Sequence, residues 1–379
     1  MESNLLRPEW SDLDSTELLF ILLELVGRPG QYDGLTTNPN IFFVPLAGAA
    51  SHLKLTFSDK KQLVAIARGP AFDPAEWERV SKLIDGGRVE VGREFSFCSF
   101  RVNGSWRGER SGVQILPPPP DAPIAPDGMA ENPFILEFPV RVTDEWTVTN
   151  FRRMREHRRL TFLLNVLLTG RATIQPRRSR HLWAVEPGRA APKWVQEFFF
   201  AKLGEAVQPQ LSPASTESIR EVEAETYYGE LGYDGRPLGV PKDLDVSICN
   251  FMRLSKQYRE KFDRAAFWME SAAKQSTIAA SAAFASLAVA VEALGDRALG
   301  PTARFQTFLE RYAPGKSLEP RRKEMYALRS DILHGSGLLT MDQEFHLGWA
   351  PPELKERNLM EELWGLTRIA ARNWLKNPS

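Results

Sequence analysis

Arg329 and His334 are the two residues of this chain whose types and spacing most directly suggest chemistry. They lie in the stretch 325–337, which reads MYALRSDILHGSG. Arginine keeps its charge at any working pH and offers a planar fork of N–H donors that fits phosphate oxygens. Histidine has an ordinary pKa of about 6.5, so it can take a proton from a ribose 2′-hydroxyl or give one to a leaving oxygen. Together they could cleave an RNA phosphodiester bond without a metal ion.

The local sequence predicts that a helix ends at His334. Five residues along an ideal helix correspond to about 140° of rotation, so the two side chains would not share a face if the helix continued. Gly335 follows directly, and glycine is the usual residue just past a helix C-terminus. We therefore expect His334 on the last turn, where it can leave the helical path.

Simpler interpretations stay open for both residues. His334 could be a cation at a helix C-terminus, where the macrodipole favours it by about 0.3–1 kcal/mol. Arg329 could be an ordinary surface residue. Among possible auxiliary residues, Ser330 and Asp331 follow the arginine, and Glu292 in an alanine- and valine-rich run could orient Arg329 or face solvent.

A second arginine and histidine at the same spacing, Arg152 and His157, lie in a charged run. No helix stop follows them, so we interpret this match as fortuitous.

The part of the chain around Arg329 reads as a series of helices. Apolar periodicity and stop signals predict a long helical tract at 255–296, a short helix at 305–312, the helix of Arg329 from about 319, and a last helix at 353–376. The first tract contains AVEAL at 290–294, and the Arg329 helix contains LRSDILHG at 328–335.

This pairing of an AVEAL helix with a later LRSDILHG helix resembles the HEPN family, in particular its ApeA-like branch, over the last third of the chain. The resemblance implies a helical bundle that dimerises and sets two Arg-x4-6-His motifs face to face as one metal-independent endoribonuclease site. It assigns phosphate binding to Arg329 and acid or base catalysis to His334. Many members have Asn, Asp or His directly after the arginine, whereas this chain has Ser330 there and Asp331 one later. Members without nuclease activity serve as binding or dimerisation modules.

Charge is balanced overall but unevenly distributed. The 379 residues carry 48 basic and 48 acidic side chains, which excludes a uniformly basic surface for nucleic acid. Between 151 and 193, however, many arginines are opposed only by Glu156 and Glu186. This segment predicts RNA-phosphate contacts, although its first half could equally be the solvated end of a core helix. The candidate RNA-binding residues are Arg152, Arg155, Arg158, Arg177, Arg178 and Arg180.

The first part of the chain predicts a β-rich domain. Period-two alternation and short apolar runs predict strands at 52–57, 63–67, 88–91, 95–102, 134–138 and 139–142, with helices at 13–26 and 74–84. We expect a helix at 152–169, strands at 171–185 and 195–200, and a loop at 206–230. The predicted domains are residues 1–150, a basic connecting region at 151–245, and the helical bundle at 246–379.

Other chemistries find no support in the sequence. It has no phosphate-binding loop, no His-Glu-x-x-His zinc motif and no Gly-x-Ser-x-Gly elbow, and its five histidines are scattered. We expect neither a metal nor a cofactor. Cys98 and Cys249 form no redox motif, and no leader peptide or membrane span is visible, so we expect a cytoplasmic protein without a membrane partner.

The sequence thus predicts an α+β protein with a β-rich N-terminal domain and an all-α HEPN-type bundle. We expect a homodimeric endoribonuclease acting on RNA, with a phage or host trigger sensed by the N-terminal domain, in prokaryotic antiviral defence or as a toxin. One alternative is a non-catalytic module that dimerises and binds RNA or a nucleotide. Another is a regulator whose N-terminal domain senses a ligand.

Overall fold

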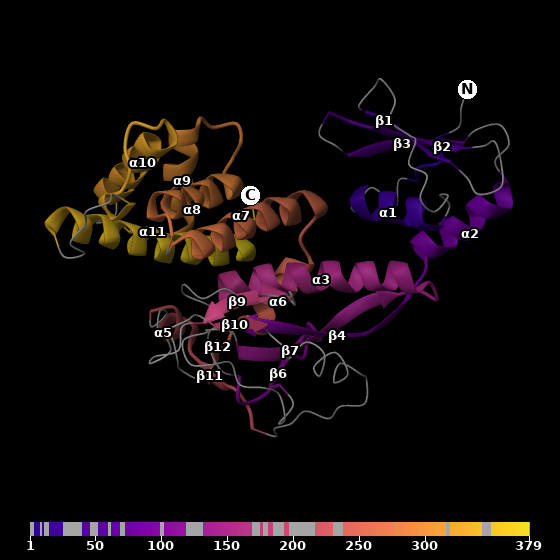
Figure 1. Ribbon diagram of the computed structural model, residues 1–379, viewed down its shortest axis with the longest axis horizontal. Coiled ribbons are helices and arrows are strands. Elements are labelled where there is room, and N and C mark those ends of the chain that lie inside the picture. The colour runs from indigo at the N-terminus through magenta and orange to yellow at the C-terminus, as the bar shows by residue number, and fades with distance from the viewer. Residues whose placement is uncertain are drawn as a thin grey trace. The chain divides into compact units, whose positions relative to one another are not determined.

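The computed structural model shows an α+β architecture, with strands prominent in the N-terminal part and helices in the C-terminal part (Figure 1). It describes residues 4–7, 10, 15–25, 40–45, 52–59, 62–68, 73–98, 102–118, 132–168, 175–176, 181–184, 193–196, 217–229, 238–276, 278–315, 319–342 and 350–378. The chain divides into two compact units. The first contains Met1–Val91 and Val140–Glu156, and the second contains Gly92–Pro139 and His157–Ser379. The predicted α+β fold class is therefore confirmed.

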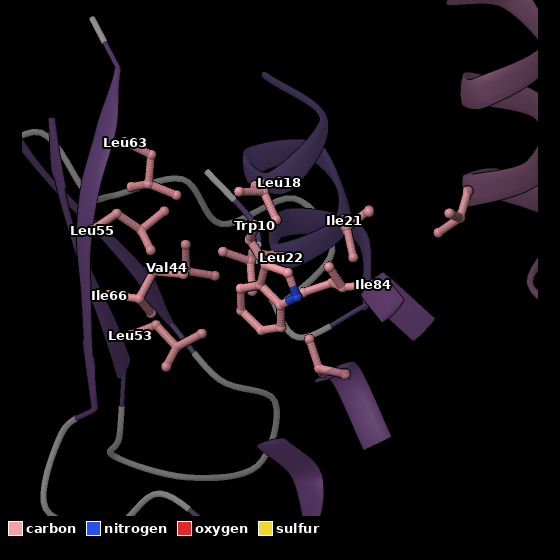
Figure 2. Close-up of a cluster of buried hydrophobic side chains, with 12 residues drawn as sticks. Trp10, Leu18, Ile21, Leu22, Val44, Leu53, Leu55, Leu63, Ile66 and Ile84 are labelled. Carbon is pink, nitrogen blue, oxygen red and sulfur yellow. The ribbon is translucent and has the colours of Figure 1, made fainter. Parts of the chain in front are cut away.

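The first unit contains a three-stranded antiparallel sheet of order β1-β2-β3. Its elements are α1 (Ser15–Leu25), β1 (Ile41–Pro45), β2 (His52–Phe57), β3 (Leu63–Arg68) and α2 (Pro74–Asp85). Leu53 and Leu55 are fully buried while their strand neighbours are half-buried, as period-two alternation requires. Figure 2 shows these leucines facing Leu18 and Leu22 of α1. The core of this unit thus lies between the sheet and the helices.

The start of α2 follows from its sequence. The side chain of Asp73 accepts a hydrogen bond from the backbone N–H of Ala75 at 2.8 Å, and Pro74 occupies the first helical position. An aspartate cap followed by proline is a strong helix start, because proline has no N–H to leave unpaired there.

The second unit contains a five-stranded sheet of order β5-β6-β7-β4-β8. The strands are β4 (Arg88–Cys98), β5 (Trp106–Arg107), β6 (Gln114–Leu116), β7 (Asn132–Val142) and β8 (Gln175–Pro176), and β4 and β7 also contribute residues to the first unit. The strands predicted at 88–91 and 95–102 are one continuous strand as far as Cys98, and those predicted at 134–138 and 139–142 are also one. Pro139 therefore lies within a strand and does not divide it.

Helix α3 (Trp146–Leu167) begins six residues before the predicted start at 152. Basic residues suggested the later start, but the side chain of Val148 in the first turn is fully buried. Beyond α3, β9 (His181–Ala184) pairs antiparallel with β10 (Lys193–Gln196), and β11 (Arg220–Val222) pairs parallel with β12 (Gly239–Pro241).

The loop predicted at 206–230 is wrong for its described part, which contains β11 and α5 (Ala224–Gly229). Residues 206–216 lie outside the described ranges. Tyr227 anchors α5, because its side chain is buried and its hydroxyl donates to the carbonyl of Leu168 at 2.6 Å. Sequence composition alone gave no sign of that contact.

The C-terminal helices are α6 (Leu244–Met252), α7 (Lys256–Gln275), α8 (Ala280–Leu294), α9 (Pro301–Tyr312), α10 (Glu319–Leu333) and α11 (Pro351–Lys376), with the short 3₁₀ helix η3 (Thr340–Asp342) before α11. The tract predicted at 255–296 is two helices. Helix α8 packs against α7, α9, α10 and α11, and its alanines allow this close approach on several sides (Figure 1). Within the described ranges, no helix is long and apolar enough to cross a membrane.

Candidate active site

Helix α10 ends where the sequence predicts. Its last residue is Leu333, and the backbone N–H of His334 still donates to the carbonyl of Ser330 at 3.0 Å. Gly335 then adopts a φ of 71°, in the left-handed region that favours glycine. His334 is exposed and sits between the last helical residue and this glycine. The expectation that it terminates a helix is confirmed.

Arg329 is held one and a half turns earlier on α10 by a carboxylate from α8. Its Nη2 donates to Glu292 Oε2 at 3.0 Å and lies 2.8 Å from Oε1, without hydrogen-bond geometry to the second oxygen. The two side chains are only 13% and 11% exposed. Glu292 therefore contacts Arg329 and does not face solvent, while its role in orienting that side chain for chemistry stays a prediction.

Tyr326 gives Arg329 a second contact. The guanidinium carbon lies 5.4 Å from the centroid of the tyrosine ring, within the range of a cation–π interaction. The Arg-x4-His spacing does not mark this tyrosine as part of the site. Its position three residues before Arg329 on the same helix was the available signal, because such residues are neighbours on a helix surface.

The electrostatics of this pair are unusual for a surface ion pair. Burial raises the pKa of the Glu292 carboxyl, and the charges of Arg329 and Arg304 offset only part of that rise. Meanwhile the Nε of Arg329 is buried and has no hydrogen-bond partner among the described residues. Because this donor is buried, a phosphate could be contacted only by the terminal Nη groups of the guanidinium, of which Glu292 occupies one N–H.

Ser330 and Asp331, the other proposed auxiliary residues, belong to the end of α10. The hydroxyl of Ser336 donates to the carbonyl oxygen of Asp331 at 3.1 Å, and the backbone N–H of Ser336 donates to the same carbonyl at 2.9 Å. Ser330 supplies the carbonyl that His334 uses. Both residues shape the turn that follows His334, and their chemical roles stay a prediction.

The proposed RNA-binding arginines have different fates. Arg152 is 3% exposed, and its Nε donates to Glu17 Oε1 at 2.8 Å while its other nitrogens donate to the carbonyls of Ile84 and Gly86. Contact of Arg152 with a phosphate was the wrong expectation, because this guanidinium neutralises a buried carboxylate. Arg155 also pairs with Glu17.

Arg158 fits the expectation of a solvent-facing cation better. It is exposed, and its guanidinium carbon lies 5.2 Å from the centroid of the Phe162 ring. Arg177, Arg178 and Arg180 lie outside the described residues.

In the second Arg-x4-His match, the histidine is also part of the protein interior. His157 is buried, its Nε2 lies 2.7 Å from the hydroxyl of Ser96, and its ring stacks on that of Phe138. Neither member of this match is accessible to a substrate, which agrees with the interpretation of the spacing as fortuitous.

Among the described residues, no group of three or more His, Cys, Asp or Glu side chains could hold a metal ion, and the buried Cys98 and Cys249 are not joined in a disulfide. Comparison of the chain with protein-family models, with curated proteins and with solved structures finds no match. Arg329, His334 and their surroundings are therefore the features from which a function can be inferred.

Proposed function

We propose that the protein is a HEPN-type endoribonuclease that cleaves RNA without a metal ion. The observation that carries this proposal is the arrangement around α10, where Glu292 holds Arg329 through one guanidinium N–H and an exposed His334 follows at the glycine-terminated end. A cation that binds phosphate and a side chain that transfers protons are the minimum that phosphodiester cleavage by the 2′-hydroxyl requires.

The chemistry is an internal transesterification. His334 takes the proton of the ribose 2′-hydroxyl, or protonates the departing 5′-oxygen, as that 2′-oxygen attacks phosphorus and the bond to the 5′-oxygen breaks. Arg329 stabilises the additional negative charge on the phosphoryl oxygens. The products are a 2′,3′-cyclic phosphate and a 5′-hydroxyl.

One histidine cannot act as base and acid at the same moment, so a second copy of the chain would supply the second histidine. Two chains related by a two-fold axis would present two Arg329 and two His334 side chains to one phosphate, through an isologous interface. The strand-rich N-terminal unit would sense a phage or host trigger or position the RNA. Together these roles describe a cytoplasmic antiviral or toxin ribonuclease.

The experiment is incubation of the purified protein with total RNA in EDTA. We expect cleavage by the wild type and none by His334→Ala or Arg329→Ala, each checked for retained fold by circular dichroism. Arg297→Ala serves as the arginine control, because Arg297 is exposed and lies outside α10. Activity that EDTA abolishes and magnesium or manganese restores would remove this mechanism.

A non-catalytic module is the second candidate, and the Arg329–Glu292 pair is the observation that favours it. An arginine already neutralised by a half-buried carboxylate can serve packing and specificity alone. In that case the protein would bind RNA or a nucleotide as a dimer and leave the RNA intact, and His334→Ala would leave binding unchanged.

A further inference from the structure

The segment that follows His334 returns to the start of α8. The side chain of Leu339 is fully buried, and its backbone N–H donates to the hydroxyl of Ser281 at 2.8 Å. The carboxylate of Asp342 accepts from the backbone N–H of Ala280 at 2.7 Å and from that of Ser281 at 2.6 Å. Three hydrogen bonds therefore tie residues 339–342 to the first turn of α8.

Helix α8 needs this carboxylate because its own sequence provides no cap. The residue at its N-cap is Ala279, whose φ of −150° and ψ of 87° are non-helical and whose methyl group accepts nothing. The first N–H groups of a helix have no partner within the helix, and a carboxylate there also interacts favourably with the macrodipole. Asp342 supplies from a distant part of the chain what an Asp, Ser or Thr at position 279 would supply locally.

Glu356 of α11 adds another anchor to the same segment. Its Oε2 accepts from the backbone N–H of Thr340 at 2.7 Å, and its Oε1 accepts from the Thr340 hydroxyl at 3.0 Å. In contrast, residues 333–336 are exposed, and no side-chain hydrogen bond of His334 is found within the described ranges. The position of His334 is therefore set by what holds the backbone on either side of it.

We infer that Ser281 and Asp342 are positioning residues for His334, an inference that rests on the proposed function. Helix α8 holds Arg329 through Glu292 and holds the segment after His334 through its N-terminal turn. Ser281 and Glu292 are eleven positions apart, which is about 16 Å along a helix. One rigid helix thus sets both ends of the stretch that contains the phosphate-binding and proton-transferring side chains.

The test separates positioning from simple capping. Asp342→Ala removes the cap of α8 and one anchor of the segment together, whereas Asp342→Ala combined with Ala279→Asp restores a local cap and leaves that anchor missing. We expect the single variant to have both a lower melting temperature and a lower kcat than the wild type. The double variant should regain the melting temperature while kcat stays at least about tenfold low, since small misplacements of catalytic groups cause large losses of rate. KM should change little, because Glu292 and Arg329 are untouched.

Three further variants complete the design. Ser281→Ala removes the acceptor for Leu339 and leaves the Asp342 cap, so kcat should fall here as well, and Ser281→Thr should rescue it. Asp296→Ala is the matched control, because Asp296 accepts from the N–H of Ala298 at 2.9 Å beyond the opposite end of α8. It should leave kcat unchanged. A double variant that regains full kcat, or a Ser281→Ala protein with wild-type kcat, would overturn the inference.

Hydrogen exchange gives a readout that does not need activity. In Asp342→Ala with Ala279→Asp, the amides of 334–340 should exchange at least about tenfold faster than in the wild type, while those of α8 stay protected. If the wild type cleaves no RNA, the proposed function fails, and hydrogen exchange still decides whether Asp342 fixes the segment 334–340. Unchanged exchange at 334–340 would contradict it.

Discussion

Glu292 on α8 and Arg329 on α10 form an ion pair with 2.8 Å between Oε1 and Nη2, in surroundings that raise the pKa of the carboxyl. Attraction to the arginine therefore does not fully offset the loss of hydration by the glutamate. Carboxyls whose pKa is shifted by burial occur both in functional sites and in structural ion pairs, so variants of Glu292 are informative.

The first prediction concerns the stability of Glu292→Gln. A folded-state pKa raised above the unfolded value of about 4.5 means that the charged carboxylate is disfavoured by folding. That cost is absent when Glu292 is protonated in both states, and it is fully present above the raised pKa. Glu292→Gln should therefore equal or exceed the wild type in stability at pH 7, and the two should converge toward pH 4. Urea denaturation across this range measures the difference.

Glu324 supplies a control of opposite sign. Its pKa is lowered, first by the hydrogen bond from Lys355, so its charge contributes stability above the unfolded pKa and loses it as the pH falls through the lowered one. Glu324→Gln should be less stable than the wild type at pH 7 and should approach it in acid. Both variants shifting in the same direction would contradict the account of Glu292.

The second prediction concerns Arg329→Lys. Lysine keeps the charge but lacks the planar fork, so it cannot contact Glu292 and a phosphate oxygen at once. We expect kcat/KM for RNA to fall by about 100-fold or more, comparable to the loss of one donor to a transition-state oxyanion. The control is Lys323→Arg, an exposed position on the same helix. Wild-type cleavage by Arg329→Lys would show that charge alone suffices and would weaken the assigned role.

The sequence predicted the end of the critical helix well and its partners poorly. Gly335 indicates a helix stop through a local backbone preference, and the structure confirms that stop. The contact of Asp342 with α8 depends on how distant segments pack, for which one sequence gives no direct evidence. The sequence hints at this contact only indirectly, because the helix that starts at Ala280 has no capping residue of its own. Arg152 shows a different error. The basic residues around it suggested that it lies on the surface, but in the fold it is buried against Glu17.

The third prediction follows from that burial. Arg152→Ala should destabilise the fold by about 3–5 kcal/mol, because it leaves the carboxylate of Glu17 buried beside Arg155 alone. Arg158→Ala should change the free energy of unfolding by no more than about 0.5 kcal/mol, as is usual for exposed positions. Urea denaturation measures both variants. If Arg152→Ala lowers the free energy of unfolding only slightly, water must reach the carboxylate of Glu17.

The fourth prediction concerns assembly. A site built from one arginine and one histidine per chain needs a second copy to supply separate acid and base, so the active species should be a dimer. Adding an excess of His334→Ala to the wild type should lower the cleavage per wild-type chain, because each mixed dimer contributes one histidine where two are needed, provided that the dimers exchange subunits. Light scattering on the same samples gives the mass. A monomer that cleaves RNA at full rate would rule out a composite site.

The last prediction concerns RNA capture by the arginine-rich segment. Each arginine that contacts a phosphate releases counterions, so log affinity for single-stranded RNA should change with log salt by roughly −0.7 per contact. Replacing Arg158, Arg177 and Arg178 by glutamine should flatten that slope by about two units and weaken binding to unrelated RNAs alike, since phosphate contacts carry no sequence information. Two variants serve as controls. Arg152→Gln should leave the slope unchanged in protein that remains folded, because the guanidinium of Arg152 is paired with Glu17. His334→Ala should also leave the slope unchanged, because it removes a catalyst and not an anchor. An unchanged slope in the triple variant would make this segment a solvated face, and the anchors would then have to be sought among the C-terminal helices, near Arg321 and Lys323.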